Sequence, residues 1–309
     1  MKSNLSNEIV QCIQRIDETC VQRHVETLAG FGPRSIDDPL AVARTLDYLH
    51  SELVSYGYDV SREPFGDQPH EVNLLASVVG HQRPEAVIEL GAHYDTVRGS
   101  PGADDNASAV AGVLEIARVL CDLVCRRTVR FCLFGAEESG LRGSHAHVDA
   151  IKRNTNEQVE GIVVFEMIGY RTHQPRSQKI PIRIPLILSP PRVGDFICAI
   201  SNFRSRHMVT RFQRTARRFV PDLRLFAVKY FGGMVKDGAR SDHRPYWNDG
   251  RRGIMITDTA NFRNPHYHQP SDLPETLDYE FAAQVARATA AMLIEWAEVI
   301  NDQGPSTNV

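Results

Sequence analysis

Three short apolar segments, separated by stretches with a helical pattern, constrain the fold of this chain most strongly. The segments are Ala86–Leu90, Val129–Phe134 and Ile162–Phe165. The spacing of apolar residues predicts helices between them, over Ala107–Cys125 and Leu141–Ile151. Strands that are apolar on both faces belong to sheets that are covered on both sides. We therefore expect an α/β fold, a three-layer α/β/α sandwich around a mixed, mostly parallel central sheet.

The segments outside this core extend the same architecture. Two further β-prone segments, Tyr58–Phe65 and Val72–Val79, are predicted to form a hairpin, which would make the sheet mixed. Helices are predicted at four other places, which are residues 1–30, Ser35–Tyr56, Asp195–Val220 and Phe281–Ile300. Because no internal repeat and no Pro/Gly/Ser-rich linker divides the chain, residues 1–309 are predicted to form a single domain.

The amino-terminal segment and the cysteines bear on the location of the protein. Ile9, Val10, Ile13 and Ile16 are interrupted by polar and charged residues, as in an amphipathic helix and unlike a signal peptide. No window reaches the roughly 20 apolar residues that are needed to cross a bilayer. The sequence thus predicts a cytoplasmic protein with no membrane partner, in which cysteines without CxxC spacing are buried thiols. The six are Cys12, Cys20, Cys121, Cys125, Cys132 and Cys198.

The charge of the chain is nearly balanced but unevenly distributed. A formal net charge of -3 argues against a nucleic-acid partner, because a surface that tracks phosphates is normally basic. Of the 35 basic and 38 acidic residues, 18 and 5 lie in residues 171–252, which leaves 17 and 33 elsewhere. We expect this basic stretch to form an insert or cap beside an acidic crevice, where it would select anionic substrates or dock a partner.

Side chains that can bind metals follow each of the three apolar strands. His93 and Asp95 come after the first strand, and Glu137 and Glu138 come after the second. Glu166 comes after the third. The carboxyl ends of parallel strands meet at one edge of a sheet, which is where open α/β sheets bind ligands. Converging carboxylates repel one another unless a cation neutralises them, and a His/Asp/Glu set without thiolates suits zinc or a similar ion. The excess of carboxylates indicates two metal ions.

Five motifs resemble, in order and spacing, those of the co-catalytic zinc aminopeptidases of the bacterial leucyl-aminopeptidase type. This family is related to the glutamate carboxypeptidases and the glutaminyl cyclases. The motifs are His93-x-Asp95, Gly102-Ala103-Asp104-Asp105-Asn106-Ala107-Ser108, Gly135-Ala136-Glu137-Glu138, Glu166-Met167-Ile168-Gly169 and Tyr267-His268. The resemblance implies that His93 and Glu166 hold one zinc ion. It implies a second zinc ion on Glu138 and His268, with Asp105 as the bridge.

The resemblance also assigns the residues that would take part in catalysis. Glu137 would be the general acid and base, and Asp95 would orient the ligand imidazole. Tyr267 would donate a hydrogen bond to the developing oxyanion. One departure concerns Glu166, because the best-known members of the family carry Asp at this position. Glutamate keeps the charge and adds a methylene group, so ligation is chemically reasonable while the metal spacing depends on the longer side chain.

Other polar residues close to these motifs are expected to support the site without binding metal. His266 lies two residues before the predicted ligand His268 and is expected to be its neighbour. Ser241-Asp242-His243 resembles a segment near the site in the same family. Because the five predicted ligands already fill the metal positions, Asp242 and His243 are expected to have structural or orienting roles.

The resemblance implies a hydrolase of peptide or amide bonds, and most directly an aminopeptidase that removes N-terminal residues from peptides or small amides. Alternatives on the same site are a carboxypeptidase-like or N-acyl/γ-glutamyl amidohydrolase and a glutaminyl-cyclase-like transferase. An enzyme for acidic substrates would need arginines that face the crevice, for which Arg171, Arg240 and Arg263 are the candidates. A metal-free binding protein on the same fold is disfavoured, because all five ligands and the candidate base are present.

Overall fold

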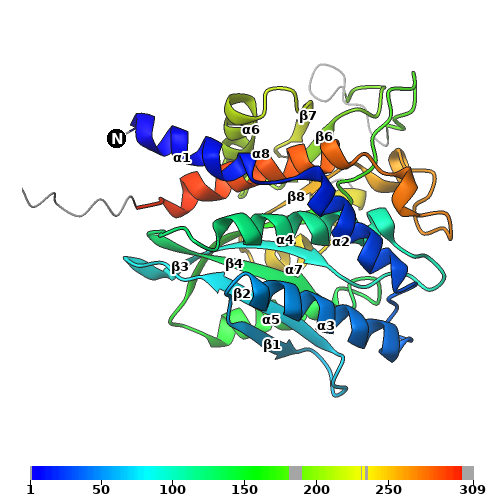
Figure 1. Cartoon of the computed structure of the whole chain (residues 1–309), viewed down its shortest axis with the longest axis horizontal. Coiled ribbons are helices and arrows are strands. Elements are labelled where there is room, and N and C mark those ends of the chain that lie inside the picture. Colours follow the sequence, from blue (N-terminus) through cyan, green and yellow to red (C-terminus); the bar gives the residue numbers. More distant parts are fainter. Residues whose placement is uncertain (1, 181–189, 231, 234–235, 301–309) are drawn as a thin grey trace, which may run out of the picture.

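An eight-stranded sheet forms the centre of the computed structural model, which describes residues 2–180, 190–230, 232–233 and 236–300 (Figure 1). Its strands lie in the order β1-β2-β4-β3-β5-β8-β6-β7. Their bounds are β1 Val60–Pro64, β2 Val72–Val78, β3 Arg83–His93, β4 Arg127–Phe134, β5 Gln158–Glu166, β6 Ile197–Ser201, β7 Leu225–Val228 and β8 Gly253–Thr257. The central strands β4, β3, β5 and β8 are parallel, and β1, β2 and β6 pair antiparallel to their inner neighbours. The sheet is mixed and mostly parallel, as predicted.

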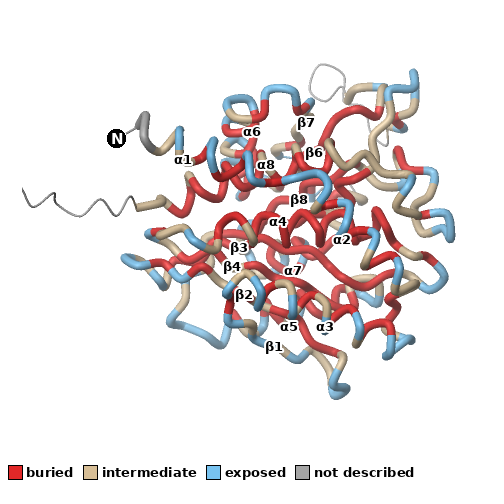
Figure 2. Tube along the Cα trace, in the orientation of Figure 1, coloured by how far each residue is buried: buried red, intermediate tan, exposed pale blue. Residues whose placement is uncertain are grey.

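Helices cover both faces of this sheet. Alternate residues of β5 point to opposite sides, so that Val163 and Phe165 join the larger apolar core whereas Ile162 and Val164 join a smaller one. The larger core is covered by α1 Lys2–Gln14, α2 Glu18–Gly30, α3 Pro39–Ser55, α4 Ala109–Leu120, α6 Arg206–Phe219 and α8 Tyr279–Ala297. The smaller core is covered by α5 Arg142–Arg153 and α7 His243–Asn248. Figure 2 shows burial running through the central strands and through α4 and α8. The predicted three-layer α/β/α sandwich is therefore confirmed.

Side-chain caps define where several helices begin. The Asp17 carboxylate accepts a hydrogen bond from the Thr19 N–H at the start of α2, and the Asp38 carboxylate caps α3 in the same way. Pro39 follows Asp38 at the first helical position, which suits its fixed φ. The helix predicted from Ser35 therefore begins at Pro39. None of the described helices is long and apolar enough to cross a membrane.

The structure corrects two of the predicted helices. Residues 1–30 form α1 and α2 rather than one helix, because α1 ends at Gln14 and Asp17 caps the start of a new helix. The helix predicted over Asp195–Val220 is wrong in its first part, where Ile197–Ser201 forms β6 and the helix starts only at Arg206. Its apolar and β-prone start belongs to the sheet, while the 3.6-residue period is confined to α6. The short strands β7 and β8 were not predicted.

The basic stretch 171–252 contributes part of the sheet itself. Its described residues include β6, β7, α6 and α7, so that much of it forms the β6–β7 edge and the helices packed beside it. The arginines of α6 lie on this edge and are Arg206, Arg211, Arg214, Arg217 and Arg218.

All six cysteines are free thiols. Four are buried, as expected, and these are Cys12, Cys125, Cys132 and Cys198. Cys20 and Cys121 are only partly buried, which differs from the prediction. Cys20 lies in the first turn of α2 and Cys121 directly follows α4, so both lie at helix ends.

Candidate metal centre

The carboxyl edge of the parallel strands gathers most of the predicted site residues. β3 ends at His93 and β5 ends at Glu166. Glu137 and Glu138 lie in the loop that follows β4. Because β3 pairs with both β4 and β5, these ends are neighbours in the sheet. The apolar strands thus deliver their polar end residues to one place.

Two more side chains reach the same place from outside the sheet. Asp105 lies in the buried segment Ala103–Ser108, which leads into α4 and in which the backbone of Asp105 itself is not helical. His268 lies in the loop between β8 and α8, where its φ of 59° places it in the left-handed region. The six side chains form two groups, which are His93, Glu137 and Glu166, and Asp105, Glu138 and His268. Within each group the candidate ligand atoms lie within 4.8 Å of one another.

The Asp105 carboxylate links the two groups, because its two oxygens face different imidazoles. Asp105 Oδ1 lies 3.4 Å from His93 Nε2, and Asp105 Oδ2 lies 3.2 Å from His268 Nε2. His268 Nε2 also lies 3.2 Å from Glu138 Oε1, and His93 Nε2 lies 3.6 Å from Glu166 Oε2. This is the arrangement that a carboxylate bridging two metal ions requires.

Several of the facing atoms are buried without a hydrogen-bond partner among the described residues. They are His93 Nε2, Asp105 Oδ1, Glu138 Oε1 and His268 Nε2. A buried polar atom without a partner is unfavourable by about 1–3 kcal/mol, so several in one place need an explanation. Imidazole nitrogens and carboxylate oxygens are ligands of zinc. The residues present therefore fit a pair of zinc ions.

The ionisation of these groups shows the same need for a cation. Burial alone would lower the pKa of His268, but the carboxylates of Asp105 and Glu138, each 3.2 Å from its Nε2, raise it to about 9. Burial, together with the charge of Asp105, raises the pKa of Glu138 to about 7. Burial and the nearby carboxylates of Glu166 and Glu138 also raise the pKa of Glu137, against the effect of His93. Without metal, protons on the imidazoles and carboxyl groups have to balance the charge.

Asp95 lies beneath the candidate ligands and is almost fully buried. Its two carboxylate oxygens accept hydrogen bonds from the backbone N–H groups of Glu137 and Glu138, at 3.0 and 3.1 Å. The Asp95 Oδ1 atom lies 3.5 Å from His93 Nδ1, while the backbone carbonyl of Asp95 lies closer to it, at 3.1 Å. Asp95 therefore orients the loop of Glu137 and Glu138 as well as the His93 imidazole.

Residues whose role was not predicted from the sequence hold the candidate ligands in place. The Ser241 hydroxyl donates a hydrogen bond of 2.6 Å to Glu166 Oε2. The Asp272 carboxylate accepts hydrogen bonds from the backbone N–H groups of Asp104 and Asp105, at 2.9 and 3.1 Å. Asp272 lies more than 160 residues along the chain from these partners, and no local pattern marks it. Ser241 belongs to the Ser241-Asp242-His243 segment, whose resemblance to the family was its only signal.

The structure leaves three other candidates outside the two groups. His266 Nδ1 is 2.9 Å from the Ser271 hydroxyl and belongs to neither group. His243 Nε2 donates to the Gly238 carbonyl at 2.9 Å, inside the protein. Asp242 is fully buried, and burial raises its pKa to about 7.

A third group of side chains also has the composition of a metal site, and it consists of Glu89, Cys132 and His147. Here the His147 nitrogens contact Glu63 at 2.8 Å and Glu89 at 3.1 Å. The Tyr246 hydroxyl donates to Glu89 at 2.7 Å. The polar atoms of this group already have protein partners, in contrast to those of the first two groups. It is therefore an ion-pair cluster that is complete without a metal.

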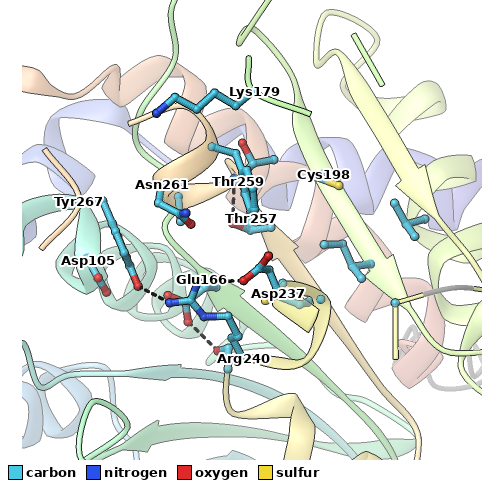
Figure 3. A pocket seen from close by; sticks show the side chains of 18 of the residues that line it. Asp105, Glu166, Lys179, Cys198, Asp237, Arg240, Thr257, Thr259, Asn261 and Tyr267 are labelled. Carbon is cyan, nitrogen blue, oxygen red and sulfur yellow. Dashed lines mark hydrogen bonds and ion pairs between the residues drawn. The ribbon is translucent and has the colours of Figure 1, made fainter. Parts of the chain in front are cut away.

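A pocket extends from the metal centre along the face of β8, β6 and β7 that points away from the larger core (Figure 3). Asp105, Glu137, Glu138, Glu166 and His268 line its inner end. Its wall is mainly apolar and includes Phe196, Cys198, Ile200, Phe226, Val228 and Met255. The alternation along β6 explains this wall, because Cys198 and Ile200 point to the pocket while Ile197 and Ala199 join the larger core.

Of the three candidate arginines, Arg240 lines this pocket. Arg171 pairs with Asp278 through two nitrogens, at 2.7 and 2.6 Å. Arg263 is buried, donates to Gln178 at 3.0 Å and lies over the ring of Phe196. Arg171 and Arg263 therefore have structural partners away from the metal centre.

A three-layer α/β/α fold with two His/carboxylate groups sharing one aspartate at the strand ends defines a co-catalytic metallohydrolase. The comparison with protein families makes this assignment specific. The profile described as "Peptidase family M28" matches residues 73–293. The chain belongs to this family of co-catalytic zinc aminopeptidases, and it is a zinc metallopeptidase.

The chain is also similar to individual proteins. The chain is 34% identical to the uncharacterised protein YfbL of Escherichia coli (strain K12) over 84% of this chain and 82% of that protein. It is 25% identical to BSAP, a zinc aminopeptidase from Bacillus subtilis, over 75% of this chain and 51% of that chain, with a TM-score of 0.58. The LapA aminopeptidase of Legionella pneumophila shares the fold, with a TM-score of 0.76 and 20% identity over 94% of this chain and 75% of that one. A glutaminyl cyclase of Fimbriiglobus ruber shares it too, with a TM-score of 0.69 and 17% identity over 90% and 94% of the two chains.

Proposed function

We propose that this metallopeptidase removes N-terminal residues with bulky apolar side chains from peptides. The observation that carries the proposal is the shared Asp105 carboxylate between two groups of unpartnered ligand atoms, beside Glu137 and at the end of an apolar pocket. His93 and Glu166 would hold one zinc ion and Glu138 and His268 the other, and Asp105 would contribute one carboxylate oxygen to each. When bound, the zinc pair lowers the pKa of a water molecule and polarises the scissile carbonyl.

Glu137 is the general base and then the general acid. It lines the pocket, and the hydrogen bond of its backbone to Asp95 fixes its position next to the ligands. Its buried environment raises its pKa, which suits a group that must accept a proton from the attacking water and return it to the leaving amine. Tyr267 also lines the pocket, and its hydroxyl donates to the oxygen that becomes negative during the attack.

The shape and polarity of the pocket support the choice of substrate. The carboxylates of Glu137 and Glu166 at its inner end attract the positively charged α-amine of a peptide. The apolar wall beyond them, with Phe196, Phe226 and Met255, takes a large hydrophobic side chain. An N-acylated substrate lacks the charged amine and would leave these carboxylates without a partner.

The alternatives on the same site have less support. An amidohydrolase for acidic substrates needs free cationic groups in the crevice, but Arg171 and Arg263 bind elsewhere. Arg240 lines the pocket with its terminal nitrogens on Asp237 and Tyr267. Lys179 also lines the pocket, so hydrolysis of an acidic substrate has to be measured directly. A single-zinc cyclase needs one set of ligands, whereas this chain offers two. The cytoplasmic location stays a prediction of the sequence, and its support is that all six cysteines are free thiols.

A panel of chromogenic substrates tests the proposal. Zinc-loaded protein is assayed with the p-nitroanilides of leucine, phenylalanine and glutamate and with N-acetyl-leucine p-nitroanilide. We expect the highest kcat/KM for leucine and phenylalanine and no hydrolysis of the acetylated compound. A preference for the acetylated compound would overturn the aminopeptidase assignment, and a preference for glutamate p-nitroanilide would overturn the proposed specificity for apolar side chains.

A further inference from the structure

Tyr267 is held against the metal centre by its ring. The ring stacks on the His268 imidazole, with centroids 3.8 Å apart and planes inclined by 20°. Tyr267 also lines the pocket together with Asp105 and Glu166 (Figure 3). The stack fixes the phenol ring, but it does not fix the direction of the O–H bond, which rotates about the C–O bond.

The Arg240 side chain meets the hydroxyl of Tyr267. Its Nη2 donates a hydrogen bond of 3.0 Å to Tyr267 Oη, and its Nη1 donates one of 3.2 Å to Asp237 Oδ1. Figure 3 shows the guanidinium group between these partners. Arg240 also precedes Ser241, whose hydroxyl binds Glu166. One short segment therefore contacts both the candidate ligand Glu166 and Tyr267.

The contact with Arg240 determines what the Tyr267 hydroxyl can do. A phenol oxygen has one proton to donate and lone pairs to accept with, and an arginine can only donate. The guanidinium therefore occupies the acceptor side of the oxygen and turns the O–H bond away from itself. No described residue accepts this proton in a hydrogen bond, so it is available to a substrate. A cationic donor on the oxygen also polarises the O–H bond and strengthens its own donation.

We propose that Arg240 is a positioning residue that acts through Tyr267, directing the Tyr267 O–H at the substrate oxygen that becomes negative. The inference rests on the proposed function, in which Tyr267 donates to that oxygen. The competing role for Arg240 is to anchor a substrate carboxylate. A bidentate anchor needs the arginine fork free, but each terminal nitrogen of Arg240 already has a protein partner.

A double-mutant cycle tests the coupling between the two side chains. Arg240→Gln, Tyr267→Phe and the double variant are compared with wild type on leucine p-nitroanilide. We expect Tyr267→Phe to lower kcat by about 100-fold, as the loss of one oxyanion donor does. Arg240→Gln should lower kcat by roughly 10-fold with KM changed less than about twofold, since only the transition state is affected. The double variant should match Tyr267→Phe, and Arg240→Lys, which keeps a cationic donor, should recover part of the activity.

Two controls separate this role from others. Arg204→Gln removes another exposed arginine of the basic stretch, which donates to the Gly250 carbonyl, and should leave kcat unchanged. Titration calorimetry gives a readout without turnover. Arg240→Gln and Tyr267→Phe should each lower the affinity for leucine phosphonic acid, a tetrahedral analogue, by about 10-fold or more. The affinity for leucine should equal that of wild type. Zinc content should equal that of wild type in all variants.

Three results would overturn the inference. The first is a double variant whose loss of kcat is the product of the two single losses. The second is an unchanged affinity of Arg240→Gln for the phosphonate. The third is a rise in KM for leucyl-leucine, which has a free carboxylate, with none for the anilide, because it would make Arg240 the anchor. Failure of the proposed function is distinct, since wild type would then hydrolyse none of the free-amine substrates.

Discussion

Asp95 accepts, through its Oδ1 atom, a hydrogen bond of 3.0 Å from the backbone N–H of Glu137. Its other carboxylate oxygen accepts from the Glu138 N–H, and the same side chain lies 3.5 Å from the His93 imidazole. A single buried carboxylate therefore sets the position of the proposed base and of ligands from both metal groups. Because Asp95 is buried, water does not compete for these hydrogen bonds. A small change at Asp95 should therefore affect the whole metal centre.

Asp95→Asn should lower zinc affinity and kcat together, each by about 10- to 100-fold. The asparagine amide has one acceptor oxygen, and its NH₂ group would face one of the two backbone N–H groups. Zinc affinity is measured by competition with a chromogenic chelator and kcat on zinc-saturated protein. The same change at the exposed Asp122 is the control and should alter neither quantity. Wild-type values for Asp95→Asn would remove the role assigned to this residue.

Neighbouring glutamates should give opposite results when each is changed to glutamine. Glu137→Gln should lower kcat by about 10²- to 10⁴-fold and keep the zinc content of wild type, because only the proton acceptor is lost. Glu138→Gln should lose zinc, because Glu138 Oε1 faces His268 Nε2 at 3.2 Å in a ligand group. Elemental analysis and single-turnover kinetics measure the two effects. Loss of zinc from Glu137→Gln would show that Glu137 is a ligand rather than the base.

Removal of zinc should destabilise the fold. Four buried ligand atoms have no hydrogen-bond partner among the described residues, and a metal that binds only the folded chain stabilises it by mass action. At a free zinc concentration of 1,000 times Kd this is about 4 kcal/mol. Thermal unfolding with and without a chelator should show a lower Tm for the stripped protein and recovery on adding zinc. Equal Tm values in both states would contradict the metal assignment.

Much of the centre could be predicted because each strand carries its ligand at its own end. The apolar run Ile162–Phe165 ends at Glu166, so one local pattern indicates both the strand and the place of the carboxylate. The supporting residues follow no such pattern. Asp272 accepts a hydrogen bond from the backbone of Asp104, although it lies far along the chain. The buried Arg34 donates hydrogen bonds to the carbonyls of Pro101 and Gly102 in the same loop. Such residues are determined by tertiary contacts, which a single sequence does not show.

The errors in the fold have a similar origin. β7 and β8 have four and five residues, too few for a period to stand out from the surrounding sequence. Over Asp195–Val220 the strong amphipathic pattern of α6 extended the predicted helix backwards across the strand β6. Pairing with β8 and β7 decides that segment, and it involves partners 25 or more residues away.

The buried cluster around His147 should give a pH-dependent contribution to stability that is independent of the metal centre. His147 faces Glu63, Glu89 and Cys132, and Glu89 is also bound by Arg130 and Tyr246. Burial alone would lower the pKa of His147, but Glu89 and the hydrogen bond to Glu63 raise it well above 6.5. Burial alone would raise the pKa values of Glu63 and Glu89, but His147 lowers both.

The sign of the pH effect follows from these directions. The imidazolium is favoured by folding, so its contribution is complete below the unfolded pKa of 6.5 and is lost as the pH rises through the higher folded value. The two glutamates stabilise the fold above their unfolded pKa of 4.5, and this stabilisation is lost as the pH falls through their lower folded pKa values. His147→Gln removes the cation from the half-buried Glu63 and leaves the buried Glu89 with Arg130, and it should cost about 1–3 kcal/mol between pH 5 and 6.5. Urea unfolding at constant zinc, with the exposed His145→Gln on the same helix as control, measures this difference. The difference between wild type and His147→Gln should shrink at alkaline pH, and a constant difference up to pH 10 would show that His147 stabilises the fold by packing rather than by charge.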